Sequence, residues 1–319
     1  MICDHTSGYY GKYKLLPTLV QLQSDITSPF PPLDLMVHIG EISAASFNDT
    51  IPAKEVWRVS EDGELRDPFK KLTTVFQMSE EMFFLHYGKD GCNRHVLIDE
   101  CRELFGEIYE QIPELPFCNI WTAMQLSSRL PKGALFHMGV SNTRRCWNMF
   151  QLPESVESAC NVGCCGIDGC VSTLVGASLV NPDRLCYVVV GDLTFFYDLN
   201  SLGNHHIGTN LRVMLVNNGR GTEFRLGIHH CNVFGDDADK YMAAAGHFGN
   251  KSPLLVKHYA EDLGFHYLSA TTKEEFMTAL SNFTNPLVKY HSMILEVFTD
   301  SKDESEALYL MSHIQSDAK

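Results

Sequence analysis

The residues after Pro131 alternate between short apolar runs and amphipathic segments, and this alternation constrains the fold more than any other feature. The apolar runs lie at residues 134–138, 185–190, 211–216, 265–268 and 293–298. Helical patterns follow them at residues 166–180, 195–202, 253–263, 273–282 and 304–314. Continuously apolar strands are typical of a parallel sheet that helices cover on both faces. The sequence therefore predicts an α/β fold with a mostly parallel sheet flanked by helices.

A smaller α/β pattern precedes this one. It has strand candidates at residues 33–40, 55–59 and 72–77 and helical patterns at residues 96–111 and 120–130. Pro113 and Pro116 separate the two helices, and we place a domain boundary there. We expect a partial central α/β domain over residues 1–112, entered after its first strand, and a second domain over residues 113–319. The acidic segment 299–306 is expected to be a solvated loop.

Composition excludes several classes of function. The chain has 319 residues, of which 45% are hydrophobic, and a formal net charge of −14. An acidic surface repels phosphate backbones and anionic lipids, so we expect neither a nucleic acid nor a membrane as partner. No apolar run approaches the ~18 residues that span a bilayer, and the first residues lack a signal-peptide pattern. The odd count of 11 cysteines indicates reduced thiols, as in a cytoplasmic protein.

Polar residues follow two of the predicted strands directly. Strand 185–190 runs into Gly191-Asp192, and strand 211–216 runs into Asn217-Asn218-Gly219-Arg220-Gly221. In a right-handed βαβ unit both strands point the same way, so Asp192 and Asn218 emerge at the same edge of the sheet. A carboxylate, an amide oxygen and a main-chain carbonyl are hard donors that suit Mg²⁺, and Gly191 allows a diphosphate to approach the backbone. The alternative is an ordinary strand-end Asp and an unrelated Asn-Asn turn.

This stretch resembles the thiamine diphosphate signature, a Gly-Asp turn followed by Asn-Asn at the end of the next strand. The resemblance implies thiamine diphosphate and Mg²⁺ as cofactors. It implies that Asp192, Asn218 and the main-chain oxygen of Arg220 bind the metal. The cofactor contacts that it implies are Gly166, Ile167, Asp168, Gly191, Asp192, Leu193, Asn218 and Gly221. Ile167 matches the bulky aliphatic residue that supports the bent cofactor.

The flanking segments narrow the resemblance. Cys165-Gly166-Ile167-Asp168-Gly169 and the segment from Gly139 to Arg145 are similar to motifs of the 2-succinyl-5-enolpyruvyl-6-hydroxy-3-cyclohexene-1-carboxylate synthases, transferases of menaquinone biosynthesis. The implied reaction is decarboxylation of the 2-oxo acid 2-oxoglutarate and carboligation to isochorismate. The resemblance implies that Ser141 and Arg145 contact substrate carboxylates.

Two departures keep the substrate open. Val162 stands where the family has an arginine that contacts a substrate carboxylate, and Arg220-Gly221 replaces Gly-Gly, which adds a cation beside the cofactor. A related 2-oxo acid decarboxylase or synthase with another substrate is therefore a second candidate.

The activating half of the site is expected elsewhere. In the superfamily a glutamate on a pyrimidine-binding domain activates the cofactor, usually across a subunit interface, and nothing in this chain resembles that domain. We expect it before residue 1 or on a partner chain, in a homo-oligomer or a hetero-complex, and we expect this chain alone to be inactive. A third candidate is a non-catalytic subunit or isolated domain that needs its partner.

Cysteines and histidines gather at two further places. Cys160, Cys164, Cys165 and Cys170 form one cluster, and His229-His230-Cys231 forms the other. Their spacing fits zinc sites only loosely, so packing thiols are the favoured interpretation and zinc the alternative.

Overall fold

The structure, a computed structural model, describes residues 1–24, 30–40, 51–88, 96–163, 165–227, 229–241, 252–287 and 290–314. The chain forms two compact units. The large unit comprises Met1–Leu19 and Pro113–Ser312, and the small unit comprises Val20–Ile112 and His313–Lys319. A short helix, α1 (Thr18–Gln21), spans the point in the sequence where the chain passes from one unit to the other.

The small unit holds a three-stranded parallel sheet in the order β1-β2-β3. Its elements are β1 (Leu33–Ile39), β2 (Ala53–Val59), β3 (Leu72–Phe76), α2 (Glu80–Tyr87) and α3 (Val96–Glu110). The sequence pattern did not indicate α2. Ser79 caps this helix by accepting the Met82 N–H, and Phe83 packs against Phe76 of β3 with ring centroids 5.0 Å apart.

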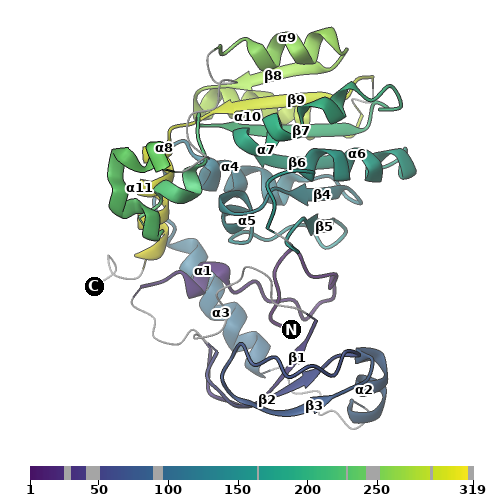
Figure 1. The fold of residues 1–319 in the computed structure, drawn as a ribbon, viewed down its shortest axis with the longest axis vertical. Coiled ribbons are helices and arrows are strands. Elements are labelled where there is room, and N and C mark those ends of the chain that lie inside the picture. Colours follow the sequence, from purple (N-terminus) through teal and green to yellow (C-terminus); the bar gives the residue numbers. More distant parts are fainter. Residues whose placement is uncertain are drawn as a thin grey trace. The chain divides into compact units, whose positions relative to one another are not determined.

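The large unit holds a six-stranded sheet in the order β5-β4-β6-β7-β9-β8, with every neighbouring pair parallel. Figure 1 shows helices packed around this sheet. Its strands are β4 (Leu135–Met138), β5 (Glu157–Cys160), β6 (Cys186–Gly191), β7 (Leu211–Asn217), β8 (His266–Ala270) and β9 (Met293–Phe298). The α/β class with parallel sheets flanked by helices is therefore confirmed.

The core lies along β6 and β7. Every residue of β7 and all of β6 except Gly191 are buried, as continuously apolar strands require when helices cover both faces. Val171, Leu174 and Val175 of helix α6 (Cys170–Val180) pack into the same apolar cluster as β6 and β7.

The remaining helices of the large unit include several short ones. The α-helices are α4 (Asn119–Leu126), α5 (Asn142–Trp147), α7 (Asp192–Tyr197), α8 (Ala238–Tyr241), α9 (Leu255–Asp262), α10 (Lys273–Phe283) and α11 (Ser301–Ser312). The 3-10 helices are η1 (Ser127–Arg129), η2 (Leu199–Gly203), η3 (Thr222–Arg225) and η4 (His230–Asp237). None of the helices in the described ranges is long and apolar enough to cross a membrane.

The prediction of a solvated loop over residues 299–306 is wrong. Helix α11 begins at Ser301, and Glu304 on this helix is 1% exposed. Its carboxylate accepts the backbone N–H of Asn119 at 2.7 Å. This hydrogen bond compensates for the hydration that the carboxylate loses on burial. The charges of neighbouring residues in the sequence could not indicate such a long-range contact.

The order of the strands reverses at β4. The chain passes from β4 to its neighbour β5 and then returns to the other side of β4 to form β6, β7 and β9. In open parallel sheets the crevice beside such a reversal, at the carboxyl ends of the strands, is where ligands bind.

Candidate functional site

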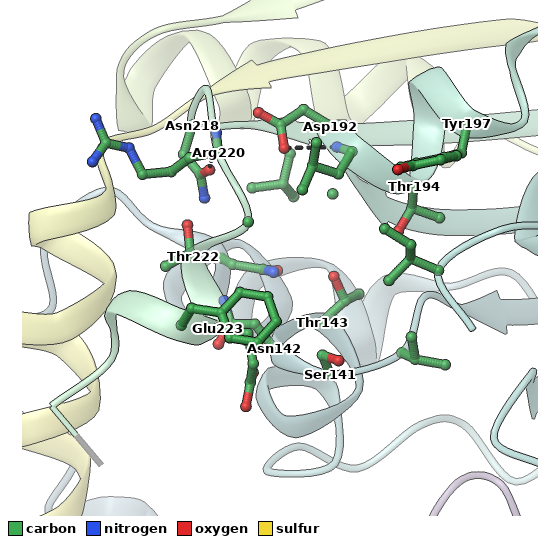
Figure 2. Close-up of a pocket in the computed structure, with 18 of the residues that line it drawn as sticks. Ser141, Asn142, Thr143, Asp192, Thr194, Tyr197, Asn218, Arg220, Thr222 and Glu223 are labelled. Atoms are coloured by element: carbon green, nitrogen blue, oxygen red, sulfur yellow. Dashed lines mark hydrogen bonds between the residues drawn. The ribbon is translucent and has the colours of Figure 1, made fainter. Parts of the chain in front are cut away.

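A cavity of about 400 Å³ lies at this reversal point, at the carboxyl ends of β4, β6 and β7. Figure 2 shows its polar side chains arranged around a common space. One side, which we call the strand-end wall, consists of the residues that follow β6 and β7: Gly191, Asp192, Leu193, Asn218, Arg220 and Gly221. The other side, the helix wall, consists of Ser141, Asn142 and Thr143 at the start of α5 and Thr222, Glu223 and Phe224 of η3.

The strand-end wall is positioned by the parallel pairing of β6 with β7, in which Gly191 lies opposite Val216. Asp192 and Asn218 therefore follow adjacent strands and line the same cavity. Asp192 is 2% exposed, and its Oδ1 accepts the Leu193 N–H at 2.8 Å. The Oδ1 of Asn218 accepts the N–H of Arg220 at 3.3 Å. This wall presents a carboxylate, an amide and a backbone turn to the cavity.

A buried hydrogen-bond network backs the strand-end wall. The Asn217 side chain donates to Glu296 Oε1 at 2.7 Å, and the Tyr267 hydroxyl donates to Glu296 Oε2 at 2.7 Å. Burial raises the pKa of Glu296 above its ordinary value, although these two hydrogen bonds oppose the shift. The network links the end of β7 to β9 and β8.

The glycine-rich segment before α6 reaches the cavity through Ile167 and Cys165. A Cβ on Gly166 would lie 2.6 Å from Oδ1 of Asp168, so a larger residue here would displace the Asp168 carboxylate. Gly169 adopts a φ of +76° at the start of α6.

The helix wall begins with a strained residue. Ser141 precedes α5 with φ 59° and ψ −123°, a region that residues with a side chain rarely adopt. Such strain costs on the order of 1–3 kcal/mol and gathers at binding sites. The segment from Ser141 to Thr143 lines the cavity. Residues that do not line the cavity hold this segment in place through the contacts described next.

Buried groups hold α5 near both ends. Glu304 Oε2 accepts the Asn142 side-chain amide at 3.4 Å. Burial raises the pKa of Glu304 to about 7. At the other end of α5, Asn148 Oδ1 accepts the His5 N–H at 2.9 Å, and the ring of His5 lies 2.8 Å from the Phe150 carbonyl oxygen.

Arg145 of α5 makes an ion pair with Glu223 of the helix wall. Its guanidinium donates to both carboxylate oxygens of Glu223, at 2.9 and 2.5 Å. Burial opposes the charged form, but the hydrogen bonds and charge of Glu223 prevail and raise the pKa of Arg145.

Most of the residues predicted from the sequence come together in this cavity. Those that line it are Ser141, Ile167, Gly191, Asp192, Leu193, Asn218, Arg220 and Gly221. Those that do not are Arg145, Gly166 and Asp168. The sequence did not indicate Asn119, Thr222, Glu223 or Glu304. Asn119 and Glu304 meet across 185 residues, and Glu223 meets Arg145 across 78.

Of the cysteine and histidine clusters, only Cys165 is among the described residues that line the cavity. In the described ranges, no three side chains of His, Cys, Asp or Glu lie close enough to hold a metal. Cys170 is buried, Cys160 is half-buried and Cys165 is exposed, whereas Cys164 lies outside the described residues.

No protein-family model matches the chain. The sequence is 33% identical over 263 residues to 2-succinyl-5-enolpyruvyl-6-hydroxy-3-cyclohexene-1-carboxylate synthase of Bacteroides fragilis, covering 81% of this chain and 45% of that protein. It is 32% identical over 265 residues to the same-named synthase of Phocaeicola vulgatus, covering 81% of this chain and 44% of that protein. The synthase of Christiangramia forsetii is 33% identical over 199 residues, which is 62% of this chain and 33% of that protein. The chain thus spans less than half the length of these curated relatives.

Proposed function

Because this chain is related in sequence to part of the 2-succinyl-5-enolpyruvyl-6-hydroxy-3-cyclohexene-1-carboxylate synthases, we propose that its cavity binds thiamine diphosphate together with Mg²⁺. One observation carries the proposal. Asp192 and Asn218 follow adjacent parallel strands beside the point where the strand order reverses, and both line one cavity.

The donors of the strand-end wall fit a diphosphate-bound metal. The Asp192 carboxylate, the Asn218 amide oxygen and the Arg220 carbonyl are oxygen ligands of the kind that Mg²⁺ prefers, with phosphate and water completing its octahedron. A Cβ added to Gly191 would meet no atom within 4 Å, so this position leaves open space beside the backbone. Phosphate oxygens need such space to approach the main chain.

The apolar residues of the cavity support the ring end of the same ligand. Ile167 and Leu193 lie on its border with Val216, and apolar surface there excludes water. Gly166 and Asp168 flank Ile167 in the sequence. When bound, thiamine diphosphate supplies the carbon centre at which a 2-oxo acid loses carbon dioxide.

The relationship implies decarboxylation of 2-oxoglutarate and carboligation to isochorismate. In this proposal Ser141 presents its hydroxyl to the substrate from the strained turn before α5. Arg145 binds a substrate carboxylate only when its pair with Glu223 opens. Full activity needs the pyrimidine-binding domain and its activating glutamate, from a partner chain or a longer protein, so this chain alone gives no turnover.

Calorimetric titration of the full chain with thiamine diphosphate tests the proposal. We expect binding that requires Mg²⁺ and that weakens at least about tenfold in Asp192→Ala, because metal sites lose on the order of 10–100-fold even when a supporting residue is removed. Asp183→Ala is the matched control, since Asp183 is exposed and precedes β6, at the opposite end of the strand from Asp192. Binding that is independent of Mg²⁺, or equal in the two variants, contradicts the proposal.

A further inference from the structure

Cys165 differs in exposure from the neighbouring cysteines of its cluster. It is exposed and lines the cavity, whereas Cys160 is half-buried and Cys170 is buried. Burial raises the pKa of Cys160 to about 12 and that of Cys170 to about 11. Because the thiolate is the nucleophilic form of cysteine, these two thiols stay protonated and inert near neutral pH. Within the described part of the cluster, Cys165 is therefore the thiol that a reagent from solution can reach.

A turn of the backbone holds Cys165 beside the cavity. The Cys165 N–H donates to the Val162 carbonyl at 3.2 Å, and the Cys165 thiol donates to the same oxygen at 3.5 Å. Cys165 has a φ of 51°, which residues with a side chain rarely adopt. Three non-glycine residues in the described ranges have a positive φ, and two of them, Ser141 and Cys165, line this cavity. The thiol is thus fixed at the cavity by its own turn.

Independent evidence shows that this cavity is suited to a polar ligand. Two buried polar atoms of its lining have no hydrogen-bond partner among the described residues. They are Oδ1 of Asn119, on a residue that is 2% exposed, and Oγ1 of Thr222, on a residue that is 4% exposed. Buried polar groups are normally satisfied. A group attached to Cys165 therefore enters a space that already offers hydrogen bonds to a ligand.

From these observations we propose that Cys165 is a modification site, at which exchange with a small disulfide excludes the cofactor from the cavity. The inference rests on the proposed function for the identity of the excluded ligand. The Cys165 thiol releases its proton to solvent, and its sulfur attacks one sulfur of the small disulfide. A new S–S bond forms to Cys165, the S–S bond of the reagent breaks, and its other half leaves as a thiolate. Cys165 is oxidised and the leaving half is reduced, so an added dithiol reverses the step.

The size of the cavity explains why modification and cofactor binding exclude each other. The cavity has a volume of about 400 Å³, and Cys165 lines it together with Ile167, which the proposed function places against the ring end of the cofactor. A tripeptide such as the glutathionyl group, attached to Cys165, takes up space that the cofactor needs. A bound cofactor in turn covers the thiol.

The test treats the full chain with oxidised glutathione near neutral pH and locates the modified cysteines by mass spectrometry of peptides. Cys165 is expected to react before Cys160 and Cys231, which are both half-buried. Calorimetry then counts the sites for thiamine diphosphate with Mg²⁺. The number of sites should fall in proportion to the fraction of Cys165 that is modified, and dithiothreitol should restore it.

Protection by the cofactor provides a second measurement. Thiamine diphosphate with Mg²⁺, at about ten times its dissociation constant, should slow the modification of Cys165 about tenfold, because only the free protein reacts. The rate at Cys231, which does not line the cavity, should stay the same. Equal rates at Cys165 with and without bound cofactor would overturn the inference.

Three variants identify the thiol that is responsible. In Cys165→Ser, treatment with oxidised glutathione must no longer reduce the number of cofactor sites. Cys231→Ser is the control for a half-buried thiol outside the cavity and must keep the sensitivity of wild type. Cys164→Ser must keep it too, and this variant excludes a disulfide between the two adjacent cysteines. Loss of sites that persists in Cys165→Ser, or modified Cys165 without loss of sites, refutes the proposal.

Failure of this inference is distinguishable from failure of the proposed function. If the reduced chain binds thiamine diphosphate with Mg²⁺ but Cys165 does not react, the cofactor assignment stands and the modification site is refuted. If the reduced chain does not bind the cofactor, the proposed function falls, and the reaction rates alone decide on Cys165. A faster reaction at Cys165 than at Cys231 then supports the modification site, and an equal or slower one overturns it.

Discussion

The two walls of the cavity are held in place by different kinds of interaction. The strand-end wall follows from the main-chain pairing of β6 with β7, which fixes Asp192 and Asn218 relative to each other. The helix wall depends on contacts that charged side chains make with residues far away in the sequence. Glu304 lies 185 residues from Asn119, and Arg145 lies 78 residues from Glu223. Main-chain pairing is insensitive to pH and to single substitutions, whereas buried ionisable contacts are not. The helix wall should therefore be the part that chemical conditions perturb.

The largest expected effect concerns Glu304. Its pKa is raised by burial from 4.5 to about 7, so the folded state binds this proton more tightly than the unfolded chain. The resulting stability is fully present below pH 4.5 and is lost as the pH rises through 7. The glutamine in Glu304→Gln does not titrate. The unfolding free energy of this variant, relative to that of wild type, should therefore increase by about 3 kcal/mol as the pH rises from 4.5 to 8. Urea unfolding at several pH values measures this, and parallel curves for the two proteins would refute it.

His5, which contacts the other end of α5, has the opposite effect on how stability changes with pH. Burial, aided by the charge of Lys14, lowers the pKa of His5 to about 4. Its contribution to stability is fully present above pH 6.5 and is lost as the pH falls through 4. His5→Gln should therefore resist acid better than wild type, by up to about 3 kcal/mol. Between pH 4.5 and 6.5 the slopes of Glu304 and His5 oppose each other, so each variant exposes the slope of the remaining group.

A smaller effect is expected for the network behind the strand-end wall. Glu296→Ala leaves the buried amide of Asn217 and the hydroxyl of Tyr267 without their acceptor, which should lower the unfolding free energy by about 2 kcal/mol. Glu261, exposed on α9, is the matched control, and its change to Ala should stay within about 0.5 kcal/mol. Because the main-chain pairing of β6 and β7 remains, Glu296→Ala should still bind thiamine diphosphate with Mg²⁺. Loss of that binding would show that side chains, not the strand pairing, position this wall.

The difference between the two walls, main-chain pairing in one and long-range side-chain contacts in the other, also explains how much of the site the sequence could predict. The continuous apolar runs of β6 and β7 identified a buried parallel pair, and that pair placed Asp192 and Asn218 on one edge. Glu304 was expected in solvent because its neighbours are acidic, and its burial depends on two distant donors, the N–H of Asn119 and the side-chain amide of Asn142. Helix α5 was missed because it is six residues long and contains two arginines. Periodicity needs longer segments, and a long-range ion pair leaves no local pattern.

Relieving the strain at Ser141 should increase the unfolding free energy, whereas Glu296→Ala should lower it. Its φ of 59° is a conformation that glycine adopts without steric cost, so Ser141→Gly should raise the unfolding free energy by about 1 kcal/mol despite the added freedom of the unfolded chain. Ser305 in the interior of α11 is the control, where glycine should instead cost about 0.5 kcal/mol. Thermal unfolding of both variants measures the difference. Destabilisation by both would mean that the turn before α5 carries no relievable strain.

The smallest effect on stability comes from comparing two buried threonine hydroxyls, one without a protein partner and one that is hydrogen-bonded in the fold. Thr222 Oγ1 is buried without a protein partner, so Thr222→Val should leave stability unchanged or raise it by about 0.5 kcal/mol. Thr122 is equally buried, but its hydroxyl donates to the Asn119 carbonyl at 2.9 Å, so Thr122→Val should cost about 1 kcal/mol. Denaturant unfolding compares the two at one pH. Equal losses would place Thr222 among ordinary core contacts, whereas opposite signs would show that the Thr222 hydroxyl, unlike that of Thr122, adds nothing to the stability of the fold.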